Sequence, residues 1–251
     1  MALIMGVALV SFTGWAPGDE KVELDAERAV DKFATFDMEK IEETVKAFLE
    51  SKTVDERAKL IRHAERVKPL MKGFYGGDQI AAEGFESFNK SEVSYRGDLL
   101  TALAQTVDFS EFPIAVERVG KGKEAKYHVD WESWVGFCEL KPEEMHQKKP
   151  VTPTLMRVLI FPDEYYNYEF NDDKKWRSYR LELRNSEFAF QGYVDRGSGV
   201  GKTLAGLENK GAPAPYLVKV AYPRKARAKD QVEIVEVISA GWIYEAPSKK
   251  K

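Results

Sequence analysis

The spacing of apolar residues changes along the chain, and this change limits the folds that the sequence can adopt. Near the start, Ile41, Val45 and Phe48 recur at the three- and four-residue intervals of an amphipathic helix. From residue 153 onward the apolar runs are strand-like. The run VEIVEV at 232–237 mixes valine and isoleucine with two glutamates, so one face of that strand is wet. Helices that precede strands with one solvent-exposed face predict an α+β fold, in which N-terminal helices pack on a curved antiparallel sheet.

Short polar motifs predict where the N-terminal helices begin and end. Asp37 stands where a helix needs an N-cap, and Thr53 with Glu56 forms a T-x-x-E capping box. Gly76 ends the apolar spacing, because glycine is a common residue just after a helix. We therefore expect two or three short helices between residues 37 and 75.

The middle and C-terminal parts of the chain predict strands separated by turns. Residues 98–107 fit a helix or a strand equally well, so periodicity leaves them undecided. Asp130 is placed to cap a helix that starts at Trp131. The remaining expected strands are rich in β-branched or aromatic residues and lie within 112–119, 125–131, 154–161, 176–184, 187–196, 216–223 and 231–245.

Composition bounds the architecture and the partners. The chain has 251 residues, of which 43% are hydrophobic, so it can bury the core of one large domain or of two small ones. We expect an N-terminal apolar segment and linker (1–36), a single α+β domain (37–245) and a basic tail (246–251). The formal net charge of −3 gives no electrostatic reason to expect nucleic acid as a partner.

The cysteine and histidine content argues against thiol and metal chemistry. Cys138 is the only cysteine, so no intramolecular disulfide can form. The three histidines, His63, His128 and His146, lie far apart in the sequence and show no zinc-ligand spacing. We therefore predict no metal, no cofactor and no catalytic thiolate.

The N-terminal stretch MALIMGVALVSFTGWA bears on localisation. It is apolar from Ala2 to Ala16 except for Ser11 and Thr13. It is shorter than the roughly 20 residues of a spanning helix, and it lacks the basic region of a signal peptide. Three interpretations stay open: a truncated signal anchor, a poor signal peptide, or a buried segment. We expect a membrane-tethered or exported protein, with membrane contact through this segment, and keep a cytoplasmic location as the alternative.

The stretch DRGSGVGKTLAGL, residues 195–207, is similar to a phosphate-binding loop, because glycines precede Lys202 and Thr203. The P-loop pattern requires its first glycine where this chain has Arg196. We also expect the preceding strand to pair in a hairpin, whereas a P-loop follows a parallel strand. We predict a flexible Gly/Ser loop with a solvated Lys202, and nucleotide binding through 197–203 is the second alternative function.

Residues 161–176, FPDEYYNYEFNDDKKW, combine three tyrosines with five acidic residues. Such a set can line a polar pocket, and a carboxylate pair can transfer protons. The structural alternative is that the rings pack at a sheet-to-loop junction with wet hydroxyls. If the segment is extended, Tyr166 and Tyr168 face inward and Tyr165 is more exposed. Our candidate pocket residues are His128, Asp130, Trp134, Tyr166 and Tyr168.

Four stretches of the sequence carry a family resemblance: RHAERVKPLM, VDWESWVGF, DEYYNYEF, and WRSYRLEL followed by FQGYV. Together they resemble an uncharacterised group of bacterial proteins that often have an N-terminal hydrophobic anchor. The resemblance covers roughly residues 37–245 and implies a cystatin/NTF2-like cone. That fold hosts isomerases, dehydratases and plain binding modules, so the resemblance gives no residue a chemical role.

These observations favour a non-catalytic binding or interaction domain of NTF2-like type, whose partner is a small molecule or a protein. The sequence offers no obvious acid, base and nucleophile set. The alternative is an isomerase, dehydratase or hydrolase that acts in the cavity of the cone. In that case His128, Asp130 and Tyr166 transfer protons, provided that they converge on one pocket.

Overall fold

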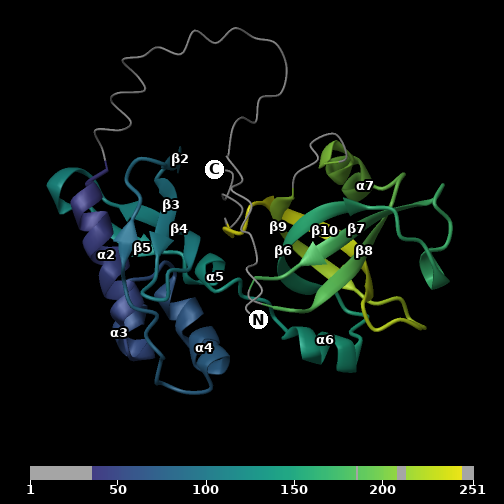
Figure 1. Ribbon diagram of the computed structural model, residues 1–251, viewed down its shortest axis with the longest axis horizontal. Coiled ribbons are helices and arrows are strands. Elements are labelled where there is room, and N and C mark those ends of the chain that lie inside the picture. The colour runs from purple at the N-terminus through teal and green to yellow at the C-terminus, as the bar shows by residue number, and fades with distance from the viewer. Residues whose placement is uncertain (1–35, 185, 208–212, 245–251) are drawn as a thin grey trace, which may run out of the picture. The chain divides into compact units, whose positions relative to one another are not determined.

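The structure is a computed structural model that describes residues 36–184, 186–207 and 213–244 (Figure 1). The predicted N-terminal apolar segment, apart from Phe36, and the predicted basic tail lie outside these residues. Within the described residues, no helix is both long enough and apolar enough to span a bilayer.

Three helices form where the capping motifs predict them: α2 (Met38–Glu50), α3 (Val54–Ala58) and α4 (Ala64–Tyr75). The Asp37 carboxylate accepts a backbone N–H from the first turn of α2. Thr53 and Glu56 make both hydrogen bonds of the capping box at α3. Gly76 ends α4 in the left-handed region at φ 73°, where glycine has no steric penalty. The prediction of short helices in this region is confirmed.

An antiparallel sheet follows the helices, with the strands β1 (Ser87–Phe88), β2 (Ser94–Arg96), β3 (Leu99–Gln105), β4 (Glu111–Val119) and β5 (Lys126–Val129). The strand order is β1-β3-β4-β5, and β2 also pairs with β3. The stretch that periodicity left undecided is therefore a strand. After β5, the Asp130 carboxylate accepts the Ser133 backbone N–H at 2.8 Å and caps the one-turn helix α5 (Trp131–Trp134), as predicted.

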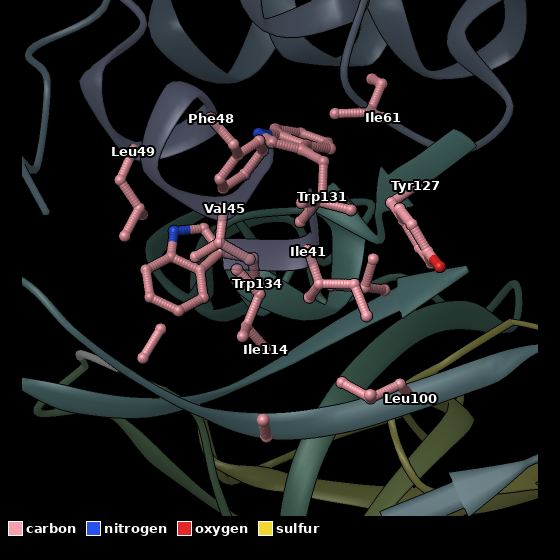
Figure 2. Close-up of a cluster of buried hydrophobic side chains, with 14 of the residues drawn as sticks. Ile41, Val45, Phe48, Leu49, Ile61, Leu100, Ile114, Tyr127, Trp131 and Trp134 are labelled. Atoms are coloured by element: carbon pink, nitrogen blue, oxygen red, sulfur yellow. The ribbon is translucent and has the colours of Figure 1, made fainter. Parts of the chain in front are cut away.

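The N-terminal core lies between helix α2 and this sheet (Figure 2). Ile41, Val45 and Phe48 form the predicted apolar stripe and are fully buried. Trp131 and Trp134 from α5 join them, with only 1% and 3% of their surfaces exposed. Burying each such large side chain stabilises the fold by about 1.5–3 kcal/mol relative to leaving it in water.

The second half of the chain forms a closed five-stranded barrel, preceded by helix α6. Its elements are α6 (Pro142–Lys148), β6 (Thr154–Asp163), β7 (Trp176–Glu182), β8 (Ala189–Asp195), β9 (Ala214–Ala221) and β10 (Gln231–Ala240). The order around the barrel is β10-β8-β7-β6-β9, closed between β9 and β10. All neighbours are antiparallel except β8 and β10, which run parallel. A short helix, α7 (Gly199–Leu204), and the 3-10 turn η3 (Ala205–Leu207) follow β8.

The barrel has its own apolar core. Leu181 and Phe190 face each other across β7 and β8, and both are buried. A Cβ at Gly192 would lie 2.7 Å from the Leu181 side chain and 3.0 Å from Ile234, so only glycine leaves room for them. The size of this one residue therefore sets the packing of the barrel interior.

The α+β class and the packing of N-terminal helices on an antiparallel sheet are confirmed. The cystatin/NTF2-like cone is not confirmed, because the strands divide between two sheets, each with its own core. The physical reason is the closure of the barrel. Pairing β10 with both β8 and β9 leaves no free edge in the barrel that could extend the first sheet.

Candidate functional site

The candidate site lies on the outside of the barrel, where the connection between β6 and β7 carries the acidic and aromatic segment. We call residues 164–175 the tyrosine loop. Tyr165 and Tyr168 expose 49% and 48% of their surfaces. Tyr168 opens the 3-10 turn η2 (Tyr168–Phe170) with a φ of 48°. The prediction that Tyr168 faces inward is wrong, because the loop turns here and does not stay extended.

Phe170 anchors the tyrosine loop to the barrel wall. Its ring stacks on that of Tyr193 from β8, with ring centroids 4.1 Å apart and an angle of 5° between the planes. It also meets Trp176 edge-on, with centroids 4.9 Å apart. Phe170 is 2% exposed. One loop residue is therefore held in an aromatic cluster, which fixes the neighbouring tyrosines.

Hydrogen bonds from two side-chain amides, those of Gln191 and Gln231, hold the loop from the other side. Gln191 Nε2 donates to Ser178 Oγ at 2.6 Å and to Asp163 Oδ2 at 2.8 Å. Gln231 Nε2 donates to the Asn167 side chain and to the Tyr193 hydroxyl. Asn167 Nδ2 in turn donates to the Tyr165 hydroxyl at 2.6 Å. A chain of amides and hydroxyls thus runs from β10 to an exposed ring.

The loop between β9 and β10, residues 222–230, borders the same surface, and we call it the basic loop. Arg227 Nε donates to Glu169 Oε1 at 2.7 Å, and the Arg227 guanidinium lies 5.0 Å from the centre of the Tyr168 ring. The Tyr222 hydroxyl donates to the Lys229 carbonyl. The Tyr222 bond closes the basic loop on itself, and the Arg227 contacts connect the two loops, so Tyr168 is positioned from both.

The electrostatics of the face keep most of its groups in fixed protonation states. Burial raises the pKa of Tyr193, so its hydroxyl stays neutral. Burial works against the charged form of Glu169, but the hydrogen bonds and the charge of Arg227, together with a backbone hydrogen bond, outweigh it and lower the pKa of that carboxyl. At neutral pH Tyr193 therefore presents a neutral hydroxyl and Glu169 a carboxylate to this face.

The five predicted pocket residues do not form one cluster. His128 lies on β5 opposite Glu117, where burial lowers the pKa of the imidazole. Asp130 is taken up by the α5 cap and by an ion pair with Arg62, and Trp134 belongs to the N-terminal core. Tyr166 and Tyr168 lie in the tyrosine loop. Within the described residues, no hydrogen bond or ring contact joins the first three to the two tyrosines.

Sequence reasoning missed the residues on which the tyrosine loop rests: Tyr193, Gln191 and Gln231. A signal was present, because Gln191 and Tyr193 are two positions apart on β8 and so point to one face of the strand. The pairing of β8 with β10, which brings Gln231 to Gln191, had no such local signal.

The glycine-rich stretch has a packing role. Ser198 caps α7 through its hydroxyl, so the prediction of a flexible loop is wrong here. A Cβ at Gly201 would lie 2.1 Å from the Asp195 carbonyl oxygen, which explains why glycine stands at this position. Lys202 is exposed, as predicted.

Thiol and metal chemistry find no support within the described residues. Burial raises the pKa of the Cys138 thiol to about 11, so it stays protonated at neutral pH and is a poor nucleophile. No cluster of three or more His, Cys, Asp or Glu side chains in this part of the chain is arranged to hold a metal ion.

Comparison of the chain with family models, with curated proteins and with solved structures finds no match.

Proposed function

We propose that this chain is a non-catalytic binding protein that holds an uncharged oligosaccharide against the tyrosine loop. The observation that carries the proposal is the pair of half-exposed rings, Tyr165 and Tyr168, on a loop fixed by stacking and by hydrogen bonds. Rings that stay in water cost free energy, and a fixed loop keeps them available to a ligand at little further entropic cost.

The polar groups around the rings suit a ligand rich in hydroxyls. Three planar side-chain groups lie around Tyr168: the amide of Asn167, the carboxylate of Glu169 and the guanidinium of Arg227. Amides both donate and accept hydrogen bonds, carboxylates accept, and guanidinium groups donate in a fixed plane. A sugar offers hydroxyls to all three and C–H groups to the face of an aromatic ring.

The connectivity of the barrel supports a binding role by analogy of fold. Counted from β6, the strands follow the order first, second, third, fifth, fourth, which is that of OB-fold barrels. Such barrels bind oligonucleotides and oligosaccharides with the face of strands two and three and with the loops between strands one and two and strands four and five. The tyrosine loop and the basic loop occupy those two positions. A shared strand order supports a binding role but does not by itself assign a function.

Charge separates the two ligand classes. Oligonucleotide binding draws on an excess of Lys and Arg that neutralises phosphates. The segment from Asp163 to Lys175 and the basic loop together carry six acidic and six basic side chains: Asp163, Glu164, Glu169, Asp172, Asp173 and Asp230 against Lys174, Lys175, Arg224, Lys225, Arg227 and Lys229. A face without net charge favours the uncharged ligand.

The cystatin/NTF2-like assignment is kept as a proposal for the N-terminal part alone, where α2 packs along one antiparallel sheet. Tethering to a membrane or export is likewise a proposal. It rests on the apolar stretch from Ala2 to Ala16.

A glycan microarray tests the function, followed by pull-down on insoluble cellulose, chitin and starch. We expect retention on at least one of them, reduced about tenfold or more in Tyr168→Ala and Tyr165→Ala. Phe109→Ala is the matched control, since Phe109 is 73% exposed on the turn between β3 and β4. Failure to bind any glycan, or retention that both tyrosine variants keep, contradicts the proposal. Tight binding of a thymidine oligonucleotide instead assigns the face to nucleic acid.

A further inference from the structure

Arg184, just after β7, is a half-buried cation without a counter-ion in contact. Its guanidinium lies 3.8 Å from the centre of the Phe112 ring and 4.7 Å from that of Trp134. It makes no hydrogen bond or ion pair with any residue that the structure describes, and its Nε is buried without a partner. A guanidinium has five N–H donors, so the stacking leaves most of its bonding capacity unused.

Gly136 leaves space beside Arg184 that no other residue would leave. Gly136 has a φ of 61°, and a Cβ there would lie 3.1 Å from Arg184 Cβ. A side chain at position 136 would therefore be strained and would crowd Arg184. Behind this segment, Arg157 donates to the Phe137 carbonyl at 2.7 Å and fixes the backbone. The position of the unpaired cation is thus built into the fold.

Arg184 lines a groove with a volume of about 870 Å³, which we call the Arg184 groove. This volume lies within the roughly 300–1,000 Å³ range of small-molecule sites. Phe74, Val107 and Leu183 contribute apolar walls. Phe74 and Val107 are 39% and 55% exposed, so the groove offers apolar surface to an incoming ligand.

The carboxylates of the groove limit the charge of a ligand. The Glu83 carboxylate accepts from Arg57 at 2.7 Å, and Asp108 accepts from the Thr106 hydroxyl at 2.6 Å. Glu143 also lines the groove. Burial lowers the pKa of Arg184 to about 10, against the charge of Glu83, so the guanidinium stays charged at neutral pH. One unpaired cation near three carboxylates suits a single negative charge better than a dianion.

We propose that the Arg184 groove binds a small monocarboxylate with an apolar body. The carboxylate pairs with the Arg184 guanidinium, and the apolar body lies against Phe74, Val107 and Leu183. Pairing supplies the counter-charge that the buried cation lacks, and the planar fork of arginine matches a carboxylate. The site is separate from the tyrosine loop and does not depend on the function proposed for it.

Octanoate and 1-octanol test the site, because they share an eight-carbon chain and differ in charge. We expect wild-type protein to bind octanoate about tenfold or more tightly than 1-octanol, as followed by indole N–H resonances in a titration. Arg184→Gln should abolish this preference while octanol binding persists. Arg180→Gln is the matched control, since Arg180 lies four residues earlier, on β7, and its side chain is 57% exposed.

Each outcome decides the proposal. A wild-type preference that Arg184→Gln removes and Arg180→Gln keeps supports it. Equal affinity of wild-type protein for the two probes, or a preference that survives in Arg184→Gln, overturns it. If Arg184→Gln does not fold, Arg184→Lys replaces it and should weaken octanoate binding, because ammonium lacks the planar fork. Tyr168→Ala should leave the octanoate preference unchanged, so failure of the sugar proposal does not affect this one.

Discussion

Around the N-terminal core the buried polar groups are mostly ions, whereas on the barrel they are mostly amides and hydroxyls. In the first region, Arg62 Nη1 lies 2.6 Å from Asp130 Oδ2, and Arg57 Nη2 lies 2.7 Å from Glu83 Oε2. In the second, the central group is Gln191, bonded to a serine hydroxyl and a carboxylate. Breaking a buried ion pair strands a charge, while breaking a neutral bond strands only a dipole.

The difference teaches where each region tolerates change. Arg57 joins α3 to Glu83 in the loop after α4. Arg62, just before α4, is joined to β4 and to the start of α5, so these ion pairs specify one arrangement of the helices. The amide network lies beside the tyrosine loop, and the loss of one amide there leaves no buried charge unpaired. We therefore expect the N-terminal region to be the more sensitive to loss of a single polar group.

The largest effect is expected for Asp130→Ala, which removes the shorter of the two ion pairs of the buried Arg62, leaves Glu117 as its remaining partner, and removes the cap of α5. The free energy of unfolding should fall by about 3–5 kcal/mol. Asp98→Ala, which removes a carboxylate that is 61% exposed beside the half-buried Arg118, should cost about 1 kcal/mol. Urea titrations measure both, and equal losses would remove the distinction between buried and exposed pairs.

A steric change in the barrel should rank second. Gly201→Ala places a Cβ against the Asp195 carbonyl and should cost about 1–3 kcal/mol. The neighbouring Lys202→Ala should stay within about 0.5 kcal/mol, because Lys202 is exposed. Millimolar ATP with magnesium should not raise the melting temperature. A rise that Lys202→Ala abolishes would restore the phosphate-loop interpretation.

Removing the central amide of the barrel face should have a smaller effect. Gln191→Ala takes a donor from Asp163 and Ser178, and solvent can reach Asp163, so the expected loss is about 1 kcal/mol. Arg180, the cross-strand neighbour of Gln191, is the control, and Arg180→Ala should be nearly silent. A loss in Gln191→Ala as large as that in Asp130→Ala would break the comparison between the two regions.

The smallest effect concerns pH. His146 on α6 meets Phe188 and Phe190, with ring centroids 5.0 and 4.9 Å away, and burial lowers its pKa below 6.5 against the charge of Asp230. The folded state therefore disfavours the protonated imidazole. The contribution of His146 to the free energy of unfolding is fully present above pH 6.5, and it is lost as the pH drops from 6.5 toward the lower pKa of the folded state.

The test of this pH effect compares urea midpoints at about pH 7.5 and pH 5.5. His146→Gln should flatten the loss by less than about 1.4 kcal/mol, the value of one pKa unit. Burial also lowers the pKa of His128. His128→Gln therefore measures how much of the loss of stability at low pH comes from the N-terminal region. A slope that neither variant changes would mean that other groups cause it.

Local chemistry made part of the fold predictable. Asp37, Asp130 and the Thr53–Glu56 pair act within one turn of themselves, so their capping roles follow from short motifs. The strands of the barrel were also predictable from composition. The closure of the barrel was not predictable, because the parallel pairing of Val232 with Gly192 joins distant segments, and no local sequence pattern indicates this pairing.

The sites were harder to predict than the strands. The tyrosines of the loop stood out in the sequence, yet the turn at Tyr168 changed the direction in which its ring points. The Arg184 groove had no sequence signal at all. Arg184 meets Phe112 and Trp134 only after both halves of the chain have folded, and each residue alone resembles many others of its type.

Arg157 donates to two backbone carbonyls that leave the ribosome at different times. Arg157 donates to the Phe137 carbonyl, made before it, and to the Trp242 carbonyl, which lies 85 residues later. At the usual speed of synthesis, about 5–20 residues per second, the second acceptor follows by roughly 4–17 s. During that time the guanidinium must stay hydrated, since a dry and half-bonded charge is costly. Arg157 lies on the outer face of β6, because its neighbours Met156 and Val158 point into the barrel core, so its packing against the outside of the barrel is complete only when the turn after β10 has left the ribosome.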